Sequence, residues 1–314
     1  MEKPTYDPGL TQQYTGPLRR TINEDGSFNV QRRGGSWRHI HPYLFLLNIR
    51  WPAFIALVVG FYFLANVAFA LAYYLFASGE LQGNDAVSAW GRFLNEFFFS
   101  AHTLTTVGYG NIAPHGLAAN VISTIEALTG VLSFALATGL LFGRFSRPSA
   151  RIAFSRRVLM APYGDGTSLQ FRIANLRSNI LMELEAQVLL MTVERSNGTL
   201  KRAYKPLSLE RRSVQFLPLT WTIVHPIDAE SPLRGASKEE LARMEGELLI
   251  LIKAWDDTFS QIVHAQHSYR HEEFLWNHRF APAFQVDDEG SLLLDLDRLN
   301  DTVPAPVAEP DLLR

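Results

Sequence analysis

The 314-residue chain contains no cysteine, which excludes disulfide bonds, thiolate nucleophiles and cysteine-ligated zinc. Charged residues make up only 19% of it, and 29 basic and 31 acidic side chains leave a net charge of −2. That near-balance argues against a protein held to nucleic acid by bulk positive charge. The sequence has no GxxxxGKS/T nucleotide loop, no HExxH zinc motif and no local Ser/His/Asp arrangement, so it does not indicate an enzyme.

Hydrophobic residues, 47% of the chain, are concentrated in two runs. Residues 51–76 contain no charge, and residues 117–145 contain Glu126 and, at their end, Arg144. A helix of about 20 apolar residues crosses the hydrocarbon core of a bilayer. The runs therefore predict membrane-spanning helices at about 51–76 and 117–145. Two buried helices of a soluble protein are a weaker interpretation, because such helices are usually shorter and polar on one face.

Basic residues flank these runs asymmetrically. The segment between them, residues 77–116, has Arg92 as its single arginine, whereas arginines cluster on the outer sides of both runs, at Arg32, Arg33, Arg38, Arg50, Arg144, Arg147, Arg151, Arg156 and Arg157. By the positive-inside rule, both termini are predicted to be cytoplasmic. Residues 39–50 mix apolar and basic side chains and predict a short helix lying along the membrane surface, with simple continuation of the first span as the alternative.

The segment between the runs carries the most specific signal. Residues 88–104 favour a half-helix that enters the membrane without crossing it. The next residues, 105–110, read TTVGYG, in which the glycines permit backbone angles that turn successive carbonyls to one side. This string matches the TVGYG loop of potassium-channel filters, whose oxygens replace the hydration shell of K⁺. The predicted K⁺-binding residues are Thr106, Val107, Gly108, Tyr109 and Gly110.

A single filter loop per chain has a consequence for assembly. A closed ring of oxygens requires several copies of the chain, and four fit the pattern. The sequence therefore predicts a homotetramer. A potassium symporter subunit is less consistent, since such proteins carry several degenerate filter repeats in one chain. A membrane-anchored β-sandwich binding module without conduction is also less consistent, because anchoring needs no filter loop.

Further motifs extend this match, and the sequence resembles the inward-rectifier potassium channel family, in particular its prokaryotic KirBac branch. The motifs that carry the resemblance beyond the filter are NLR at 175–177, TIVHPIDAESPL at 222–233, SY at 268–269 and LWNHRF at 275–280. The resemblance implies a membrane α-helical pore domain with two transmembrane helices, a re-entrant pore helix and a filter. It also implies an all-β, immunoglobulin-like cytoplasmic sandwich after the pore.

The expected domains follow from these features. They are a cytoplasmic N-terminus with a surface helix (1–50), a pore domain (51–147, with pore helix and filter at about 88–110), the cytoplasmic sandwich (148–301) and a mobile tail (302–314). Leu169, Phe171 and Ile173 alternate with other residues at the period of a β-strand. Residues 237–247 look helical, with Ser237 and Glu240 spaced as a capping box.

The resemblance implies that the second span lines a cavity and closes at its cytoplasmic end. Phe134, Thr138 and Phe142 recur every four residues and share roughly one helix face. Phe142 is expected to form an apolar constriction that blocks ions by dewetting, with a lipid-facing position as the alternative. Strongly rectifying relatives have an acid where this chain has Phe134, so strong block by polyamine or Mg²⁺ is not expected from this position. Ba²⁺, Mg²⁺ and polyamines are the candidate blockers.

Two charged or titratable residues fall near the predicted filter. His102 stands where many family members have glutamate behind the filter, and it is interpreted either as a neutral, hydrogen-bonded group or as a pH-sensitive one. Glu126 is a carboxylate within a predicted span, which is costly enough to imply a role. It is expected either to face the cavity and concentrate cations, or to pair with the loop that supports the filter or with a neighbouring subunit.

Two further sets of charged residues are expected at the cytoplasmic side. Glu183 and Asp257 fall where relatives place acids lining a vestibule, with ordinary solvated positions as the alternative. Four arginines are candidates for anionic lipid headgroups, with membrane topology as the alternative explanation: Arg50, Arg144, Arg147 and Arg151. The sequence as a whole predicts a passive K⁺ channel of a cell membrane, the bacterial inner membrane, with no cofactor and no nucleic-acid partner.

Overall fold

The computed structural model describes residues 8–10, 13–14, 20–31, 33–34, 41–147, 150–196 and 199–306. Contacts divide the chain into a helical unit, Arg33–Arg147, and a sandwich unit that combines Met1–Arg32 with Pro148–Arg314. The first fifty residues, expected above to form one segment, are therefore shared between the two units. Arg32, Arg38, the first positions of the expected surface helix (39–40) and residues 307–314 of the expected tail lie outside the described residues.

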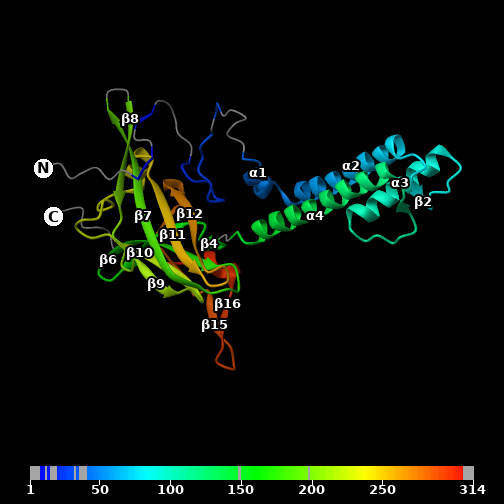
Figure 1. Cartoon of the computed structure of the whole chain (residues 1–314). Coiled ribbons are helices and arrows are strands. Elements are labelled where there is room, and N and C mark those ends of the chain that lie inside the picture. The colour runs from blue at the N-terminus through cyan, green and yellow to red at the C-terminus, as the bar shows by residue number, and fades with distance from the viewer. Residues whose placement is uncertain are drawn as a thin grey trace. The chain divides into compact units, whose positions relative to one another are not determined.

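The described part of the helical unit contains four helices, which are labelled in Figure 1. They are α1 (Pro42–Asn48), α2 (Trp51–Phe76), α3 (Ala89–Leu104) and α4 (Leu117–Phe145). By length and composition, α2 and α4 are able to cross a membrane. The backbone at Ile49 and Arg50 is extended, with ψ of 155° and 147°, so α1 is a helix separate from α2. Pro52 lies in the first turn of α2, where its missing N–H breaks no helical hydrogen bond.

The helices pack through an apolar cluster and one point of very close approach. Tyr73 of α2 and Phe99 of α3 are buried, and their rings meet edge to face at 5.2 Å between centroids. Gly130 of α4 lies against the last residue of α3. A Cβ added at Gly130 would lie 2.0 Å from the carbonyl oxygen of Leu104. Because no side chain fits in that space, glycine lets α4 pass directly behind the end of α3.

The described part of the sandwich unit consists mainly of two sheets. The larger has the strand order β1-β8-β7-β11-β12, with β9 also on β7, and the smaller has β10-β6-β5-β13, with β4 also on β6. Their bounds are β1 Gln13–Tyr14, β4 Ile152–Phe154, β5 Val158–Tyr163, β6 Gly166–Asn175, β7 Leu181–Ser196, β8 Thr199–Pro206, β9 Ser213–Phe216, β10 Thr220–Pro226, β11 Glu247–Asp256, β12 Gln261–Arg270 and β13 Phe274–Trp276.

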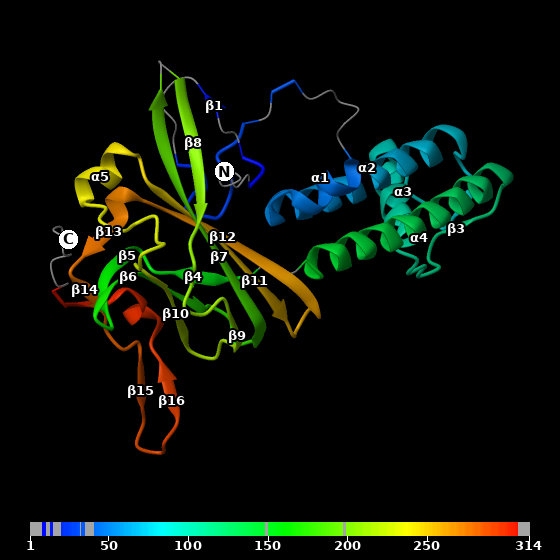
Figure 2. The same ribbon diagram turned by 90° about the vertical axis from the view of Figure 1, so that its left-hand side faces the viewer.

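Smaller elements complete the two units. Paired strands are β2 (Leu81–Gln82) with β3 (Ala113–Pro114), β14 (His278–Phe280) with β17 (Thr302–Pro304), and β15 (Phe284–Val286) with β16 (Leu292–Leu294). The short helices are α5 (Lys238–Arg243), η2 (His271–Glu273) and η3 (Leu296–Asn300). Figure 2 shows β15 and β16 extending away from the main sheets as a hairpin.

The core of the sandwich is formed by alternate residues of facing strands. Leu169, Phe171 and Ile173 of β6 are buried at 1% exposure or less, so the strand indicated by their alternation is present. They pack with buried residues of the larger sheet, such as Leu190 and Ile250. A side-chain period of two places one face of each strand in a common apolar layer.

Two boundaries differ from the sequence expectations. The capping box between Ser237 and Glu240 is present, but α5 ends at Arg243 instead of reaching residue 247. The chain turns at Glu245, which has a left-handed φ of 47°, and Glu247 already begins β11. The mobile tail expected from residue 302 does not begin there either, because Thr302–Pro304 pairs with β14.

We expect Gly130→Ala to lower the free energy of unfolding of the purified full chain in detergent by roughly 1–3 kcal/mol, because the added methyl group would overpack the contact with Leu104. Thermal unfolding measures the change. Gly139→Ala is the matched control on the same helix, since its Cβ would meet nothing within 4 Å. Equal melting temperatures for the two variants would contradict the close-approach role of Gly130.

Candidate functional site

The TTVGYG segment follows directly from α3 and is tied back to the end of that helix. Ser88 caps the start of α3 by accepting a hydrogen bond from the Gly91 amide, at 3.0 Å. At the other end, the carbonyl oxygen of His102 accepts from the amides of Val107 (2.9 Å) and Gly108 (3.2 Å). The carbonyls that a helix C-terminus leaves unpaired are thus partly used to hold the first residues of the loop.

The backbone of the segment alternates in handedness. Thr106, Gly108 and Gly110 have positive φ angles of 60°, 55° and 81°, whereas Val107 and Tyr109 do not have positive φ. Alternation between left-handed and right-handed residues turns successive carbonyl groups toward the same side of the chain. A Cβ at Gly108 or Gly110 would meet no atom within 4 Å, so these positions need glycine for their φ angles and not for space.

Thr106 is a feature that the sequence analysis did not anticipate. A positive φ is uncommon for a β-branched residue and is strained unless the surrounding structure fixes it. The sequence analysis named Thr106 among the K⁺-binding residues, but no residue-type signal marked its backbone as left-handed. At the start of the loop, the surrounding structure therefore fixes a backbone conformation that threonine itself disfavours.

Two side chains of the loop are exposed in the single chain, and one of them contacts a residue of α3. Tyr109 is 74% exposed and Val107 is 54% exposed in the single chain. On one side, the ring of His102 meets the ring of Tyr109 at 4.7 Å between centroids and 88° between planes. His102, which is half-buried, therefore lies beside the loop.

Glu126 is fully buried and joins three helices. Its carboxylate accepts hydrogen bonds from the hydroxyl of Tyr73 on α2, at 2.7 Å, and from the hydroxyl of Ser100 on α3. The Ser100 hydroxyl also lies 3.1 Å from the side-chain oxygen of Asn66, which is likewise buried. Of the two roles left open for Glu126, these contacts favour pairing with the structure that supports the loop.

The buried polar residues around Glu126, its partners Tyr73 and Ser100 and the Ser100 neighbour Asn66, were missed by sequence reasoning. Tyr73, Ser100 and Asn66 lie on segments 53, 26 and 60 positions away along the chain, so no local motif connects them to Glu126. A signal was nevertheless present, because Asn66 is an amide within the otherwise apolar first run. Polar side chains in two predicted spans are expected to face one another, since lipid offers them no hydrogen bonds.

The three residues expected on one face of α4 are all uncovered in the single chain. Phe134 is 76% exposed and Phe142 is 73% exposed, and Thr138 between them is also exposed. Their four-residue spacing on a continuous helix places them roughly in line.

Arg144, one of the four candidate lipid contacts, is held inside the helical unit. Its guanidinium donates hydrogen bonds to the backbone oxygens of Leu46 (2.6 Å) and Ile49 (2.8 Å) at the end of α1. It also lies 4.6 Å from the ring centroids of Trp51 and Phe54, a cation–π distance. Arg144 thus satisfies one carbonyl in the last turn of α1 and the carbonyl of the residue after it, and joins that helix to α4.

The other candidate lipid contacts are more open. Arg50, Arg147 and Arg151 are exposed, and the side chain of Arg147 donates to the side-chain oxygen of Asn48 at 2.6 Å. Exposed guanidinium groups keep donors available for solvent or for anionic headgroups.

Glu183 and Asp257 are both exposed in the sandwich unit, but they do not share one hollow. Glu183 has a left-handed φ of 49° at the irregularity where β7 pairs with β11. It lines a hollow of about 620 Å³ together with the basic residues Arg212 and Lys253, whereas Asp257 is not among the lining residues. The charge around Glu183 is therefore of both signs.

Comparisons with known proteins cover nearly the whole chain. The model of a family described as "Ion channel" matches residues 56–147, and that of "Inward rectifier potassium channel C-terminal domain" matches residues 152–312. The inward rectifier potassium channel Kirbac3.1 of Paramagnetospirillum magnetotacticum is 37% identical over 90% of this chain and 95% of its own length. Human G protein-activated inward rectifier potassium channel 3 is 28% identical over 97% of this chain and 83% of its own. Human ATP-sensitive inward rectifier potassium channel 14 is 29% identical over 88% of this chain and 68% of its own length.

We expect Glu126→Ala to destabilise the helical unit by roughly 1–3 kcal/mol, because the hydroxyls of Tyr73 and Ser100 would lose a buried acceptor. Thermal unfolding of the detergent-solubilised full chain measures the loss. Thr124→Ala is the control, since the exposed Thr124 hydroxyl bonds only within its own helix. A Glu126→Ala protein as stable as the control would show that the three-helix junction is not needed for stability.

Proposed function

Because the chain belongs to the inward rectifier potassium channel family, we propose that it forms a homotetrameric pore that conducts K⁺ passively through residues 106–110. The observation that carries the proposal is the alternating handedness of this segment. A backbone of that kind presents consecutive carbonyl oxygens to one side, where several symmetry-related loops together replace the water around a dehydrated K⁺ ion. The hydroxyl of Thr106 adds a further oxygen at the end of the row.

The proposed assembly of several chains follows from the single loop that each chain contributes. The chain carries one such loop, and an oxygen ring around an ion needs loops from several sides. Val107 and Tyr109 are largely uncovered in the single chain, as expected for side chains that neighbouring subunits enclose. The C-terminal end of α3 adds partial negative charge close to the permeation path, which favours a cation there.

The gate is assigned to α4. Phe142 is a large apolar side chain near the cytoplasmic end of the helix, and four copies of it around an axis form a narrow, dry ring. Thr138 and Phe134 line the cavity above it. Since Phe134 supplies no negative charge, we propose weak rectification at this position, with Ba²⁺, Mg²⁺ and polyamines as blockers that act elsewhere along the pore.

The sandwich unit and the membrane surface act on this gate. We assign Glu183 and Asp257 to the wall of a cytoplasmic vestibule, where carboxylates raise the local concentration of K⁺. The exposed arginines at 50, 147 and 151 are assigned to anionic lipid headgroups, with about 1 kcal/mol each near the surface. Both termini are placed on the cytoplasmic side of a cell membrane, the bacterial inner membrane, because arginines flank the spans on that side.

Gly108→Ala is expected to abolish K⁺ flux into liposomes while the size of the purified oligomer stays the same. An L-residue at the left-handed φ of 55° is strained by about 1–2 kcal/mol, which favours a carbonyl turned away from the ion. Flux of K⁺ and Na⁺, with and without Ba²⁺, measures conduction and selectivity. Gly60→Ala, within α2 and without a positive φ, is the control. K⁺-selective flux in Gly108→Ala would remove the filter assignment.

Phe142→Ala is expected to raise K⁺ flux without changing selectivity, because the smaller side chain leaves a wider and more easily wetted constriction. Single-channel recording in planar bilayers measures the open probability. Phe145→Ala, three residues further along α4, is the control for loss of an exposed aromatic ring. If the open probability in both variants equals that of the wild type, the constriction lies elsewhere.

A further inference from the structure

The TTVGYG loop is held at its start by α3, and its other end leads into a segment that is held by a different part of the chain. Residues 111–116, here called the exit segment, connect the loop to α4. Residues 79–84, here called the clamp segment, follow the end of α2. The strands β2 and β3 join these two segments in an antiparallel ladder, which begins three positions beyond Gly110, the last residue of the loop.

Glu80 of the clamp segment bonds both to the exit segment and to α4. Its backbone carbonyl accepts a hydrogen bond from the amide of His115 at 2.8 Å. Its carboxylate accepts from the amide of Ala119, in the first turn of α4, at 3.0 Å. The N-cap residue of α4 is Gly116, which has no side chain that could accept from this amide. Glu80 thus supplies the capping acceptor from another segment, and its negative charge is favourable at a helix N-terminus.

Two glycines let the segments approach this closely. Gly83 has a φ of 88°, and a Cβ there would overlap with the carbonyl oxygen of Asn111, the first residue after the loop. A Cβ at Gly116 would overlap with the side chain of Glu80. A larger residue at either position would therefore displace the clamp segment from the exit segment.

An apolar cluster accompanies these polar contacts. Leu81 of the clamp segment is 6% exposed, and it belongs to one cluster with Ala119 of α4 and Phe99 of α3. Ile112 of the exit segment packs against the same cluster. The clamp segment is thus supported by the two helices that precede and follow the loop in the chain.

We propose that Glu80 is a positioning residue for K⁺ binding by residues 106–110, because its contacts fix the end of the loop that α3 does not hold. The inference rests on the proposed channel function, in which these residues bind the ion. The carbonyl of His102 fixes the start of the loop, and the clamped exit segment fixes its end. Oxygens near Tyr109 and Gly110 keep their spacing only if both ends are held. A weaker clamp therefore lowers the affinity for K⁺ and the discrimination against Na⁺.

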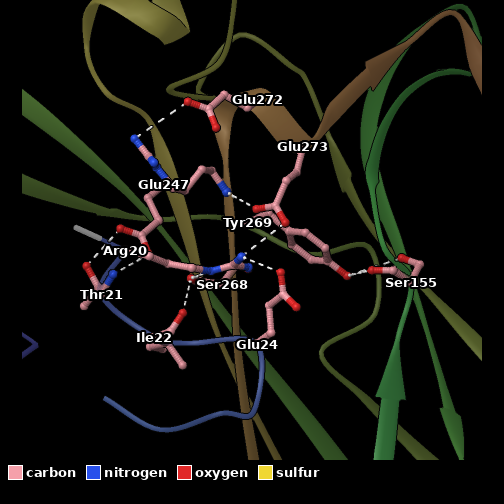
Figure 3. Close-up of polar contacts among 11 residues, drawn as sticks. Arg20, Thr21, Ile22, Glu24, Ser155, Glu247, Ser268, Tyr269, Glu272 and Glu273 are labelled. Atoms are coloured by element: carbon pink, nitrogen blue, oxygen red, sulfur yellow. Dashed lines mark hydrogen bonds and ion pairs between the residues drawn. The ribbon is translucent and has the colours of Figure 1, made fainter. Parts of the chain in front are cut away.

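The sandwich unit contains a comparable carboxylate, which provides an internal reference. Glu247 accepts hydrogen bonds from the backbone amide and from the hydroxyl of Thr21, both at 2.9 Å (Figure 3). There too a carboxylate holds the main chain of a distant segment, but residues 106–110 belong to the other unit. Loss of a hydrogen bond to Glu247 should therefore reduce stability without changing the response to K⁺.

The test compares Glu80→Ala with Glu80→Gln in the full chain. Alanine removes the acceptor for the Ala119 amide, whereas the side-chain oxygen of glutamine can still accept. The K⁺ midpoint is the K⁺ concentration, exchanged for Na⁺ at constant ionic strength, that gives half of the maximal rise in melting temperature. We expect Glu80→Ala to raise this midpoint about three- to tenfold and to lower the K⁺/Na⁺ flux ratio in liposomes by a similar factor. Hydrogen exchange of peptides covering residues 111–119 should become faster, and Glu80→Gln should restore most of all three readings.

Two controls and a second variant accompany the test. Asp85→Ala is the matched control, because it removes an exposed carboxylate from the same connection between α2 and α3. Thr21→Val is the control for general loss of stability, since it removes a hydrogen bond to Glu247. Neither should change the K⁺ midpoint. Gly83→Ala disturbs the clamp without changing its charge and should raise the midpoint, as Glu80→Ala does.

Each other outcome overturns the proposal. Faster exchange in Glu80→Ala with an unchanged K⁺ midpoint and flux ratio would show that the contact is structural only. Unchanged exchange would show that the carboxylate does not hold the exit segment. An equal shift in Asp85→Ala or in Thr21→Val would assign the effect to surface charge or to general stability. If the wild-type protein neither conducts K⁺ nor is stabilised by it, the channel function fails and this role of Glu80 fails with it, while the exchange data still decide whether Glu80 holds the exit segment.

Discussion

A main chain that offers consecutive carbonyl oxygens to one cation must alternate between left-handed and right-handed residues. Residues 106–110 meet this constraint with glycine at two of the three left-handed positions and with Thr106 at the third. A left-handed threonine persists only where its surroundings hold it. Here the His102 carbonyl binds the next two amides, and the His102 ring contacts Tyr109. The shape of this loop therefore depends on the position of the end of α3.

The position of α3 depends in turn on its two neighbours. The buried carboxylate of Glu126 accepts one hydrogen bond from a hydroxyl of α2 and another from a hydroxyl of α3. Gly130, one turn further along α4, lets that helix touch the last carbonyl of α3. In a membrane, apolar packing alone discriminates poorly between helix faces, so small residues and buried polar groups specify which faces meet. The same residues that orient α4 thereby fix the end of α3, from which the TTVGYG loop begins.

The sequence was sufficient to predict both candidate spans, the helix that ends at the TTVGYG loop, and the sandwich, and the resemblance to inward-rectifier potassium channels is confirmed by the relatives. These features are encoded locally, in run length, in a hexapeptide and in period-two alternation. What could not be predicted depends on contacts between distant segments. Ser100 contacts Glu126 only because α3 packs against α4 in the folded chain. Helix α5 ends early because Glu247 belongs to β11.

The attachment of α1 also depends on contacts between segments that are distant in the sequence. Arg144 of α4 donates to the carbonyls of Leu46 in α1 and of Ile49, which follows α1, so hydrogen bonds join the two helices. Along α4, three positions thus contact the other three helices. Glu126 bonds to α2 and α3, Gly130 approaches the end of α3, and Arg144 bonds to the end of α1. Because α4 makes contacts of this kind with every other helix of the unit, it is the element that determines how these helices pack.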